Sequence, residues 1–369
     1  METNATLAKF DTAETADCVE SCPVPEFESS MIVATYQLHK AVETGETLDR
    51  RSGMLQHFSL SCDGAAITDG LDISVHKLGD VTASSGIFDI KWSSEKIYDK
   101  AMLGIATASG SLELYELARE NNKDVLRHSG LTSGTDAASM CLSLDWNNRS
   151  LSNAQPSICV SHSDGTLSIW NTASHGIVQQ IKWSAHNLYG SPIEVWIAAF
   201  NCHDPNILFS GADDATLKGW DVRATAAPIF KNMQQYSMGV CSIQFHPHDE
   251  RLVAVGSYDE QIAIWDHRNL TRPLVKYGAG GGVWRLKWHP HENRKDILLA
   301  ACMHNGFQVL KLAKDATKLV KAASYNSHNS LAYGADWWLH PVALQAKAPI
   351  VGSASFYDHV FHVWRRSLE

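Results

Sequence analysis

Hydrophobic and polar residues alternate through residues 239–266 in a pattern that predicts three short β-strands. Residues 240–245 alternate apolar with small or polar side chains, residues 251–257 are apolar and β-branched, and residues 261–265 form a third strand-like run. The sequences HPHD and YDE, both typical of turns, separate the three runs. A sheet this small cannot cover both of its faces, so the pattern predicts stacked copies of the same unit.

The first strand of this unit recurs along the whole chain. Seven segments match it, and each is centred on an aromatic residue except the first, which has Ser21 where a tryptophan is usual. The last six anchor residues are spaced 43 to 54 residues apart, close to the roughly 40 to 45 residues of a propeller blade with loop insertions. The seven anchor residues are Ser21, Trp92, Trp146, Phe200, Phe245, Trp288 and Trp337.

These repeats predict an all-β fold, a seven-bladed β-propeller formed by residues 1–369 as a single domain. Blade seven lacks a fourth strand before the sequence stops at Glu369, whereas residues 6–12 form a strand-like segment without a partner. We therefore expect the N-terminal strand to complete blade seven and close the ring, which removes exposed sheet edges. Residues 39–56 read as a polar loop. The blades are expected near residues 15–80, 86–128, 138–187, 193–234, 238–278, 282–328 and 332–366.

Composition narrows the class of partner and the compartment. The net charge of −9 argues against a nucleic-acid or anionic-membrane surface, because both need a basic face. There is no signal peptide pattern and no apolar run long enough to span a membrane, so we expect a cytoplasmic protein, and a monomer. The eight cysteines form no CxxC pair and no metal-ligand spacing, so we expect neither a metal nor a cofactor.

Tryptophan-containing strand endings connect the repeats to a known family. The endings IWN, GWD and IWD at residues 169–171, 219–221 and 264–266 resemble those of the WD-repeat family. In that family a histidine, an aspartate, a serine and a tryptophan hydrogen-bond one another within a blade. The resemblance implies the propeller fold and a structural role for the turn carboxylates, but it says little about function. The residues at matching positions are His186, His328, Asp164, Asp214, Asp259 and Asp358.

Longer phrases give a narrower resemblance. The sequences VWIAAFN (195–201), SMGVCSIQFHPH (237–248), GGVWRLKWHP (281–290) and LLAACMHNGF (298–307) resemble those of the diphthine methyl ester hydrolases of the diphthamide pathway. This resemblance implies that the substrate is elongation factor 2 carrying a methylated diphthine on its modified histidine. The implied reaction removes a methyl ester before the final amidation.

Candidate catalytic residues are expected on one rim of the propeller, where the loops before the inner strands meet the turns between second and third strands. His304 replaces the turn aspartate of other blades, and a neutral imidazole can activate water; alternatively it is an exposed turn residue. Cys241 is either the nucleophile of a covalent route or a small packed residue. Asp336 either orients a base or is a structural residue at a strand start, and His359 is a second candidate base.

Aromatic residues on the same rim are candidates for substrate binding. Diphthine carries a quaternary ammonium group, which aromatic faces bind well, although aromatic residues here can also be ordinary channel packing. The glycine-rich run at 278–282 either presents backbone N–H groups to an oxyanion or permits a tight loop. The candidate binding residues are Trp196, Trp284, Tyr258, Tyr357, Gly281 and Gly282.

A different class of function is suggested by two W-D-x-R sequences. They end in Arg223 and Arg268 and lie on consecutive blades. Substrate receptors of cullin-type ubiquitin ligases carry such boxes, so the alternative is a non-enzymatic scaffold that binds a cullin ubiquitin-ligase adaptor. In that case the two arginines should matter and the rim histidines should not.

Overall fold

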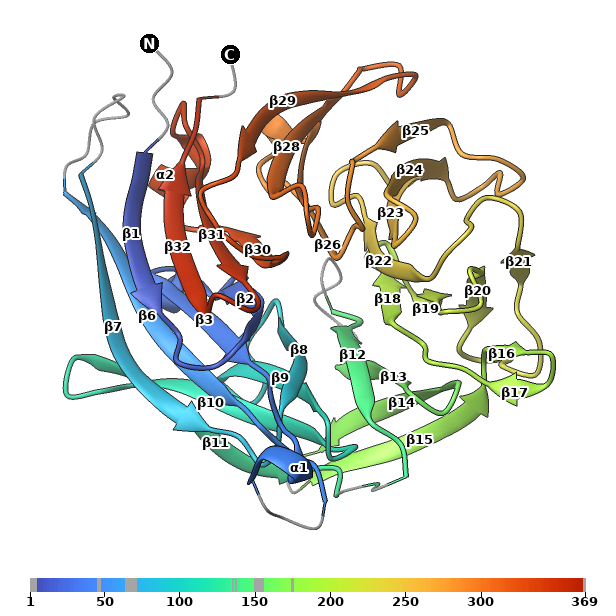
Figure 1. The fold of residues 1–369 in the computed structure, drawn as a ribbon, viewed down its shortest axis with the longest axis horizontal. Coiled ribbons are helices and arrows are strands. Elements are labelled where there is room, and N and C mark those ends of the chain that lie inside the picture. The colour runs from blue at the N-terminus through green and yellow to red at the C-terminus, as the bar shows by residue number, and fades with distance from the viewer. Residues whose placement is uncertain are drawn as a thin grey trace.

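Figure 1 shows the computed structural model, which describes residues 5–367 except 45–47, 64–71, 135, 137, 149–155 and 174–175. Seven four-stranded antiparallel sheets surround a central channel as the blades of a β-propeller, which confirms the predicted fold. The excepted ranges include parts of the predicted first and third blades, so those parts of the prediction lie outside the described residues. None of the described helices is long and apolar enough to cross a membrane.

Blades one to three each run from an inner strand at the channel to an outer strand. Blade one contains β2 (Ala16–Ser21), β3 (Ser30–Thr35), β6 (Met54–Asp63) and β7 (Asp72–Thr82). Blade two contains β8 (Ile87–Trp92), β9 (Ala101–Thr107), β10 (Leu112–Glu120) and β11 (Lys123–Thr132). Blade three contains β12 (Cys141–Trp146), β13 (Ser157–His162), β14 (Thr166–Ala173) and β15 (Gly176–Ser184).

Blades four to seven follow the same order. Blade four contains β18 (Ile197–Asn201), β19 (Asp204–Gly211), β20 (Leu217–Asp221) and β21 (Phe230–Asn232). Blade five contains β22 (Val240–Phe245), β23 (Leu252–Ser257), β24 (Gln261–Asp266) and β25 (Val275–Gly278). Blade six contains β26 (Arg285–Trp288), β27 (Ile297–Ala301), β28 (Phe307–Leu312) and β29 (Leu319–Tyr325). Blade seven contains β30 (Ala332–Trp337), β31 (Ile350–Ser355), β32 (Val360–Arg365) and the N-terminal β1 (Ala5–Asp11).

The ring closes through the N-terminal strand, as predicted. Strand β1 pairs antiparallel with β32, from Ala5 opposite Arg365 to Asp11 opposite Val360. The backbone N–H of Thr12 extends this pairing by donating to a carbonyl in the last turn, 2.9 Å away. The last strand of the chain therefore has a partner from its first segment, and Figure 1 shows the two strands side by side.

The predicted polar loop at residues 39–56 is more ordered than its sequence indicated. Strands β4 (Gln37–His39) and β5 (Arg50–Ser52) form a hairpin around the short helix α1 (Ala41–Thr44), and β6 already begins at Met54. The carboxylate of Glu14 accepts hydrogen bonds from the hydroxyls of Thr35 and Ser52, both 2.6 Å long. Because polar contacts stabilise this hairpin, its sequence shows no alternation of apolar and polar residues from which the strands could be predicted. Residues 45–47 of the predicted loop lie outside the described residues.

Short elements connect the blades. The hairpin of β16 (Asn187–Leu188) and β17 (Ser191–Pro192) leads into blade four. The remaining helical segments are η1 (Pro25–Phe27), η2 (Glu292–Arg294) and α2 (Pro341–Gln345).

Polar side chains fix the blades internally in the manner of the WD-repeat family. In blade four the ring of His186 lies 3.0 Å from Asp214 and 2.7 Å from the hydroxyl of Ser210, which also accepts the indole N–H of Trp220 at 2.9 Å. In blade five the hydroxyl of Tyr236 replaces the histidine and accepts the indole N–H of Trp265 (2.8 Å). These hydrogen bonds within the blades account for the histidine and the turn aspartate without a catalytic role.

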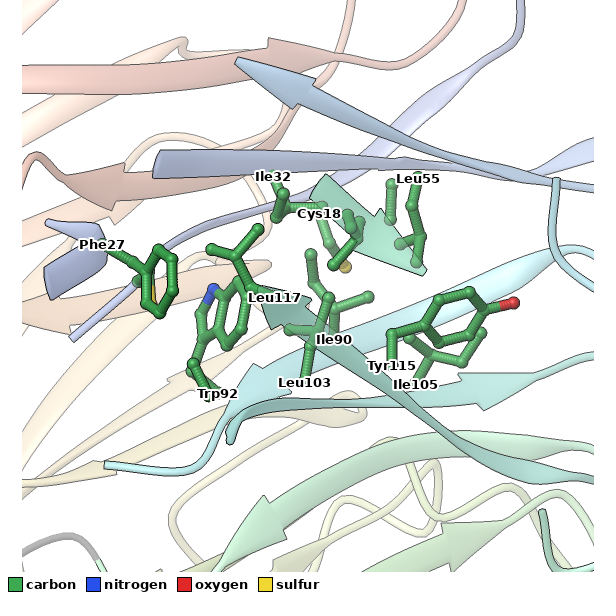
Figure 2. Packing of buried hydrophobic residues seen from close by; sticks show 14 of the residues in the cluster. Cys18, Phe27, Ile32, Leu55, Ile90, Trp92, Leu103, Ile105, Tyr115 and Leu117 are labelled. Carbon is green, nitrogen blue, oxygen red and sulfur yellow. The ribbon is translucent and has the colours of Figure 1, made fainter. Parts of the chain in front are cut away.

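The hydrophobic core is divided among the interfaces between neighbouring blades. Figure 2 shows the interface between blades one and two, where Ile32 and Leu55 of blade one pack with Ile90, Trp92 and Leu103 of blade two. Each fully buried side chain of this size contributes roughly 1.5 to 3 kcal/mol. Because each blade buries a face against both neighbours, the inner strands hold the channel residues in fixed positions.

Candidate functional site

Corresponding residues of the seven inner strands form a ring at one end of the channel. The position four residues before each anchor defines this upper ring, which lies where the inner strands begin. Aromatic and sulfur side chains line a narrow constriction here, together with Asp89 and Arg285 from the layer below. The upper ring consists of Asp17, Phe88, Leu142, Trp196, Cys241, Trp284 and Tyr333.

The structure brings together two of the predicted binding residues, Trp196 and Trp284. Their ring centroids lie 6.0 Å apart with an interplanar angle of 60°. The indole N–H of Trp196 donates to the exposed carboxylate of Asp213 at 3.2 Å, and that of Trp284 donates to Asp17 at 3.1 Å. Each indole N–H is therefore bound to a carboxyl group at the edge of its ring, which fixes the orientation of both rings.

Asp17 was not found by sequence reasoning. Its side chain is only 2% exposed, and burial raises its pKa to about 7 although the guanidinium of Arg285 opposes the shift. Arg285 also contacts Asp89 (3.2 Å) and the sulfur of Cys18 (3.2 Å). The first blade lacks the usual tryptophan anchor, so its register was less evident from the sequence. Asp17 nevertheless lies four residues before Ser21, as Trp284 lies four residues before Trp288.

Further aromatic rings connect the constriction to the rim. Trp284 stacks on Tyr333 at a centroid distance of 4.7 Å, Tyr333 contacts Phe356 at 4.8 Å, and Phe356 contacts Tyr357 at 4.9 Å. Tyr357 is 69% exposed and Tyr258, in the matching turn of blade five, is 46% exposed. The two predicted tyrosines thus lie at the rim around the tryptophan pair.

Cys241 lies in the upper ring, as its position before the anchor implies. Its thiol is buried and donates to the carbonyl of Gly239 at 3.4 Å. Burial raises the pKa of this thiol to about 12, and the negative charge of Asp213 adds to the shift. The thiol is therefore protonated at neutral pH and is a weak nucleophile.

The two predicted histidines lie on turns around the constriction. His304 is exposed in the turn between β27 and β28 and occupies the place that Asp259 has in blade five. It does not line the constriction, and within the described part of the chain its ring makes no hydrogen bond. His359 lies in the turn between β31 and β32 with a positive φ of 55°, and its carbonyl accepts the N–H of Thr12.

The predicted position of Asp336 on the rim is wrong. Asp336 is the fifth residue of β30 and lies toward the opposite end of the channel from the upper ring. Its buried carboxylate accepts the backbone N–H groups of Ser21 at 2.9 Å and Trp337 at 3.0 Å. The strand begins at Ala332, where the seventh blade was expected to begin, and Asp336 stands one residue before the anchor Trp337, at the far end of the strand from the rim.

Packing accounts for the glycine run. A Cβ atom on Gly281 would lie 2.2 Å from the carbonyl oxygen of Cys302, and one on Gly282 would lie 2.8 Å from the sulfur of Met303. Gly280 has a φ of 73°. These glycines therefore allow the loop to lie directly on the turn that carries His304.

Comparisons with known proteins relate the chain to one family. A model described as WD domain, G-beta repeat matches residues 230–266. Diphthine methyltransferase of Mus musculus is 38% identical over 90% of this chain and 69% of its own length, and that of Homo sapiens is 37% identical over 93% and 76%. The Dictyostelium discoideum diphthine methyltransferase homolog is 33% identical over 95% of this chain and 96% of its own length.

Two further comparisons are more distant. The E3 ubiquitin-protein ligase COP1 of Pisum sativum is 25% identical over 53% of this chain and 26% of its own length. A chain of the structure titled "Crystal Structure of Mitotic Checkpoint Complex" superposes with a TM-score of 0.67 at 17% identity, covering 98% of this chain and 95% of that one. At this identity the likeness concerns the fold alone.

Proposed function

The chain belongs to the diphthine methyltransferase family, and from that premise we propose that it acts in diphthamide biosynthesis as a methylesterase. The substrate is elongation factor 2 that carries a methylated diphthine on its modified histidine. Water adds to the ester carbonyl and the bond from the carbonyl carbon to the methoxy oxygen breaks. The products are the free carboxylate of diphthine and methanol.

The observation that carries this proposal is the pair of tryptophans at the constriction. A quaternary ammonium group binds best over aromatic faces, and Trp196 and Trp284 present two of them 6.0 Å apart. The exposed carboxylate of Asp213, bound to the indole N–H of Trp196, adds an attraction for positive charge. The chain's net charge of −9 also favours a cationic substrate.

Hydrolysis at this site calls for a base that deprotonates water. The buried, protonated thiol of Cys241 disfavours a covalent route. We assign the base to His304, whose exposed imidazole makes no hydrogen bond among the described residues, with His359 as the alternative base. Asp17 is a positioning residue, because it contacts Trp284 and acts through that ring.

The direct test uses purified protein and elongation factor 2 that carries the methyl ester. Mass spectrometry of the modified histidine peptide should show the loss of one CH₂ and the appearance of methanol in equal amount. A matched sample with Trp196→Leu and Trp284→Leu together should lose the reaction while keeping its melting temperature. An ester that persists in the presence of well-folded protein would contradict the proposal.

A second candidate function, binding to a cullin ubiquitin-ligase adaptor, rests on the two W-D-x-R sequences on consecutive blades. The guanidinium groups of Arg223 and Arg268 are exposed and each is held by the aspartate two residues before it, at 2.7 Å and 2.6 Å. Arg251 forms the same pair with Asp249 without a preceding tryptophan, so the geometry belongs to any Asp-x-Arg turn here. Retention of a purified adaptor by the intact chain, and its loss in an Arg223→Ala and Arg268→Ala double variant, would establish this role.

A further inference from the structure

Exposed apolar side chains surround the tryptophan pair on the rim. Met238, in the loop that opens blade five, is 47% exposed, and Tyr258 in the next turn of that blade is exposed as well. The backbone N–H of Tyr258 donates to the carbonyl of Gly239 at 2.8 Å, so Met238 and Tyr258 lie at the same edge of the blade. Tyr357 on blade seven is a third exposed apolar residue at this mouth of the channel. Apolar groups gathered on an exposed surface are typical of a site that a partner covers.

Carboxylates border these apolar side chains on blades four and five. The backbone N–H of Asp213 donates to the carbonyl of Glu194 at 3.1 Å, and a Cβ atom on Gly239 would lie 2.7 Å from the carboxylate of Asp213. The carboxylate of Asp259 accepts the backbone N–H of Ser237 at 2.8 Å. These contacts join the two blades into one continuous strip. We call this strip the acidic rim; it consists of Glu194, Asp213, Met238, Tyr258, Asp259 and Glu260.

The carboxylates of the acidic rim have no ion-pair partner among the described residues. In the matching turn of blade three, by contrast, Asp164 pairs with Lys182 at 3.1 Å. The rim segments of blades four to seven contain no lysine and no arginine. These segments are residues 193–196, 212–216, 233–239, 258–260, 279–284, 302–306, 326–331 and 356–359.

The third and fourth strands of blades four and five add three lysines near this mouth. The ammonium groups of Lys218 and Lys276 each donate to a backbone carbonyl, at 2.5 and 2.6 Å, and Lys231 is exposed on β21. With Asp214, which pairs with a histidine, the same two blades carry five carboxylates here, so the carboxylates outnumber the ammonium groups. The mouth therefore keeps a net negative charge.

This charge argues against a second copy of the chain as the partner. In a symmetric dimer a patch faces its own copy, so the carboxylates of Asp213 and Glu260 would meet carboxylates. Like charges brought together at an interface cost free energy, and the net charge of −9 adds repulsion at longer range. A partner that presents lysine or arginine side chains fits the acidic rim better.

The acidic rim is continuous with the tryptophan pair, because the carboxylate of Asp213 accepts the indole N–H of Trp196 at 3.2 Å. A protein whose modified side chain enters the constriction must therefore lay its neighbouring residues across the rim. We propose that the acidic rim docks the segment of elongation factor 2 that flanks the modified histidine. That segment presents basic side chains to the carboxylates and an apolar side chain to Met238 and Tyr258. The inference rests on the proposed function, which supplies the substrate.

Binding of elongation factor 2 that lacks the modification tests the docking apart from hydrolysis, because this protein carries no ester. Fluorescence anisotropy with the intact chain should show saturable binding. The affinity should fall as the KCl concentration rises from about 50 to about 300 mM, since salt screens exposed charges. No saturable binding, or binding that salt does not change, would overturn the proposal.

Substitutions in the acidic rim locate the binding. Glu194→Gln with Glu260→Gln removes two charges and should weaken binding about three- to tenfold, and Glu194→Lys with Glu260→Lys should weaken it at least about tenfold. Met238→Ser removes an apolar contact and should weaken binding at every salt concentration. Glu250→Gln with Glu292→Gln removes two exposed charges from the opposite face and is the matched control, which should bind as the unaltered protein does. Equal binding by the rim variants and this control would overturn the proposal.

Three outcomes separate this inference from its alternatives. Ester hydrolysis with an unchanged KM in the Glu194→Lys and Glu260→Lys variant would overturn the docking and leave the methylesterase intact. Salt-dependent binding that this variant loses, beside an ester that the unaltered protein fails to hydrolyse, would support the docking and refute the methylesterase. A dimer in sedimentation equilibrium that the same substitutions dissociate would show that a second copy covers the rim, and would overturn the proposal.

Discussion

Trp284 donates its indole N–H to the carboxylate of Asp17, a residue 267 positions earlier in the chain, across 3.1 Å. Blade seven stands between the blades that carry these residues, so the bond spans the mouth of the channel instead of joining adjacent strands. It fixes the face of one tryptophan relative to a buried acid. The properties of that acid therefore affect both stability and ligand binding.

The substitution Asp17→Asn should change the pH dependence of stability. Burial raises the pKa of Asp17 from the ordinary aspartate value of 3.8 to about 7, so between these pH values the folded state holds a proton that the unfolded state loses. The free energy of unfolding of the unaltered protein should therefore fall as the pH rises from about 4 to about 7. The variant avoids this loss and should be more stable than the unaltered protein at pH 8, by about 4 kcal/mol at most.

Urea denaturation at pH 5 and pH 8 measures this difference. Arg285 and Lys91 favour the ionised form of Asp17 and Asp89 disfavours it, and all three remain in the variant. If Asp17→Asn changed the free energy of unfolding equally at the two pH values, the pKa of Asp17 would not be raised in the folded protein.

Replacing either tryptophan of the pair should weaken substrate binding more than catalysis. Cation–π contacts contribute about 0.5 to 2 kcal/mol each, so Trp196→Leu should raise KM for modified elongation factor 2 by roughly 2- to 30-fold. Trp196→Phe keeps an aromatic face, so its KM should lie between that of the unaltered protein and that of Trp196→Leu. Steady-state kinetics separate KM from kcat; a loss confined to kcat would count against a binding role.

His304→Ala should fold normally and hydrolyse the ester at least about a hundredfold more slowly, because general-base assistance is typically worth about 10² to 10⁴ in rate. Cys241→Ala should remain nearly as active as the unaltered protein, since only about one thiol in 10⁵ is ionised at pH 7 when the pKa is about 12. Single-turnover rates give both comparisons. An inactive Cys241→Ala beside an active His304→Ala would move the chemistry to blade five.

Arg223→Ala combined with Arg268→Ala should leave ester hydrolysis intact. Both arginines follow the ends of third strands, β20 and β24, and therefore lie on the face opposite the rim. Each guanidinium group forms an ion pair with the aspartate two residues before it, on that same face. Hydrolysis assays of the double variant check this, and a large loss of rate in a folded protein would place the reaction on the other face.

Deleting residues 1–13 should lower the melting temperature and promote aggregation. The deletion removes β1 and leaves the backbone groups of β32 unpaired along the edge of blade seven. Differential scanning calorimetry and size-exclusion chromatography report the two effects. A truncated chain that melts and elutes like the full chain would show that β1 is dispensable for closure.

The sequence allowed the architecture to be predicted because each blade repeats one strand pattern with an anchor such as Trp146 or Trp288. Counting strands then showed that blade seven lacked a fourth strand and that the N-terminal segment belonged to no blade. Together these two observations predicted the closure. The charged channel was not predictable in this way. Glu20, Lys287 and Asp336 come from three different blades, and their mutual distances depend on where each strand begins.

Asp336 shows this limit most clearly. Asp336 directly precedes its anchor Trp337, and the corresponding residue of every blade lines the end of the channel opposite the rim on which the sequence pattern had placed it. Asp17 was missed for a related reason, since the first blade has Ser21 in place of the aromatic anchor that marks the register elsewhere. Both positions follow from counting back from the anchor of the blade, one residue for Asp336 and four for Asp17.

The pairing of β1 with β32 also orders events during synthesis. A ribosome synthesises Ala5–Asp11 long before Val360–Arg365, so the first strand emerges well before its partner exists. Blades one to six can form as the chain grows, but blade seven waits until Val360–Arg365 has emerged. The growing protein therefore carries one unpaired strand through most of the synthesis of the propeller, and its circle is completed by the last blade.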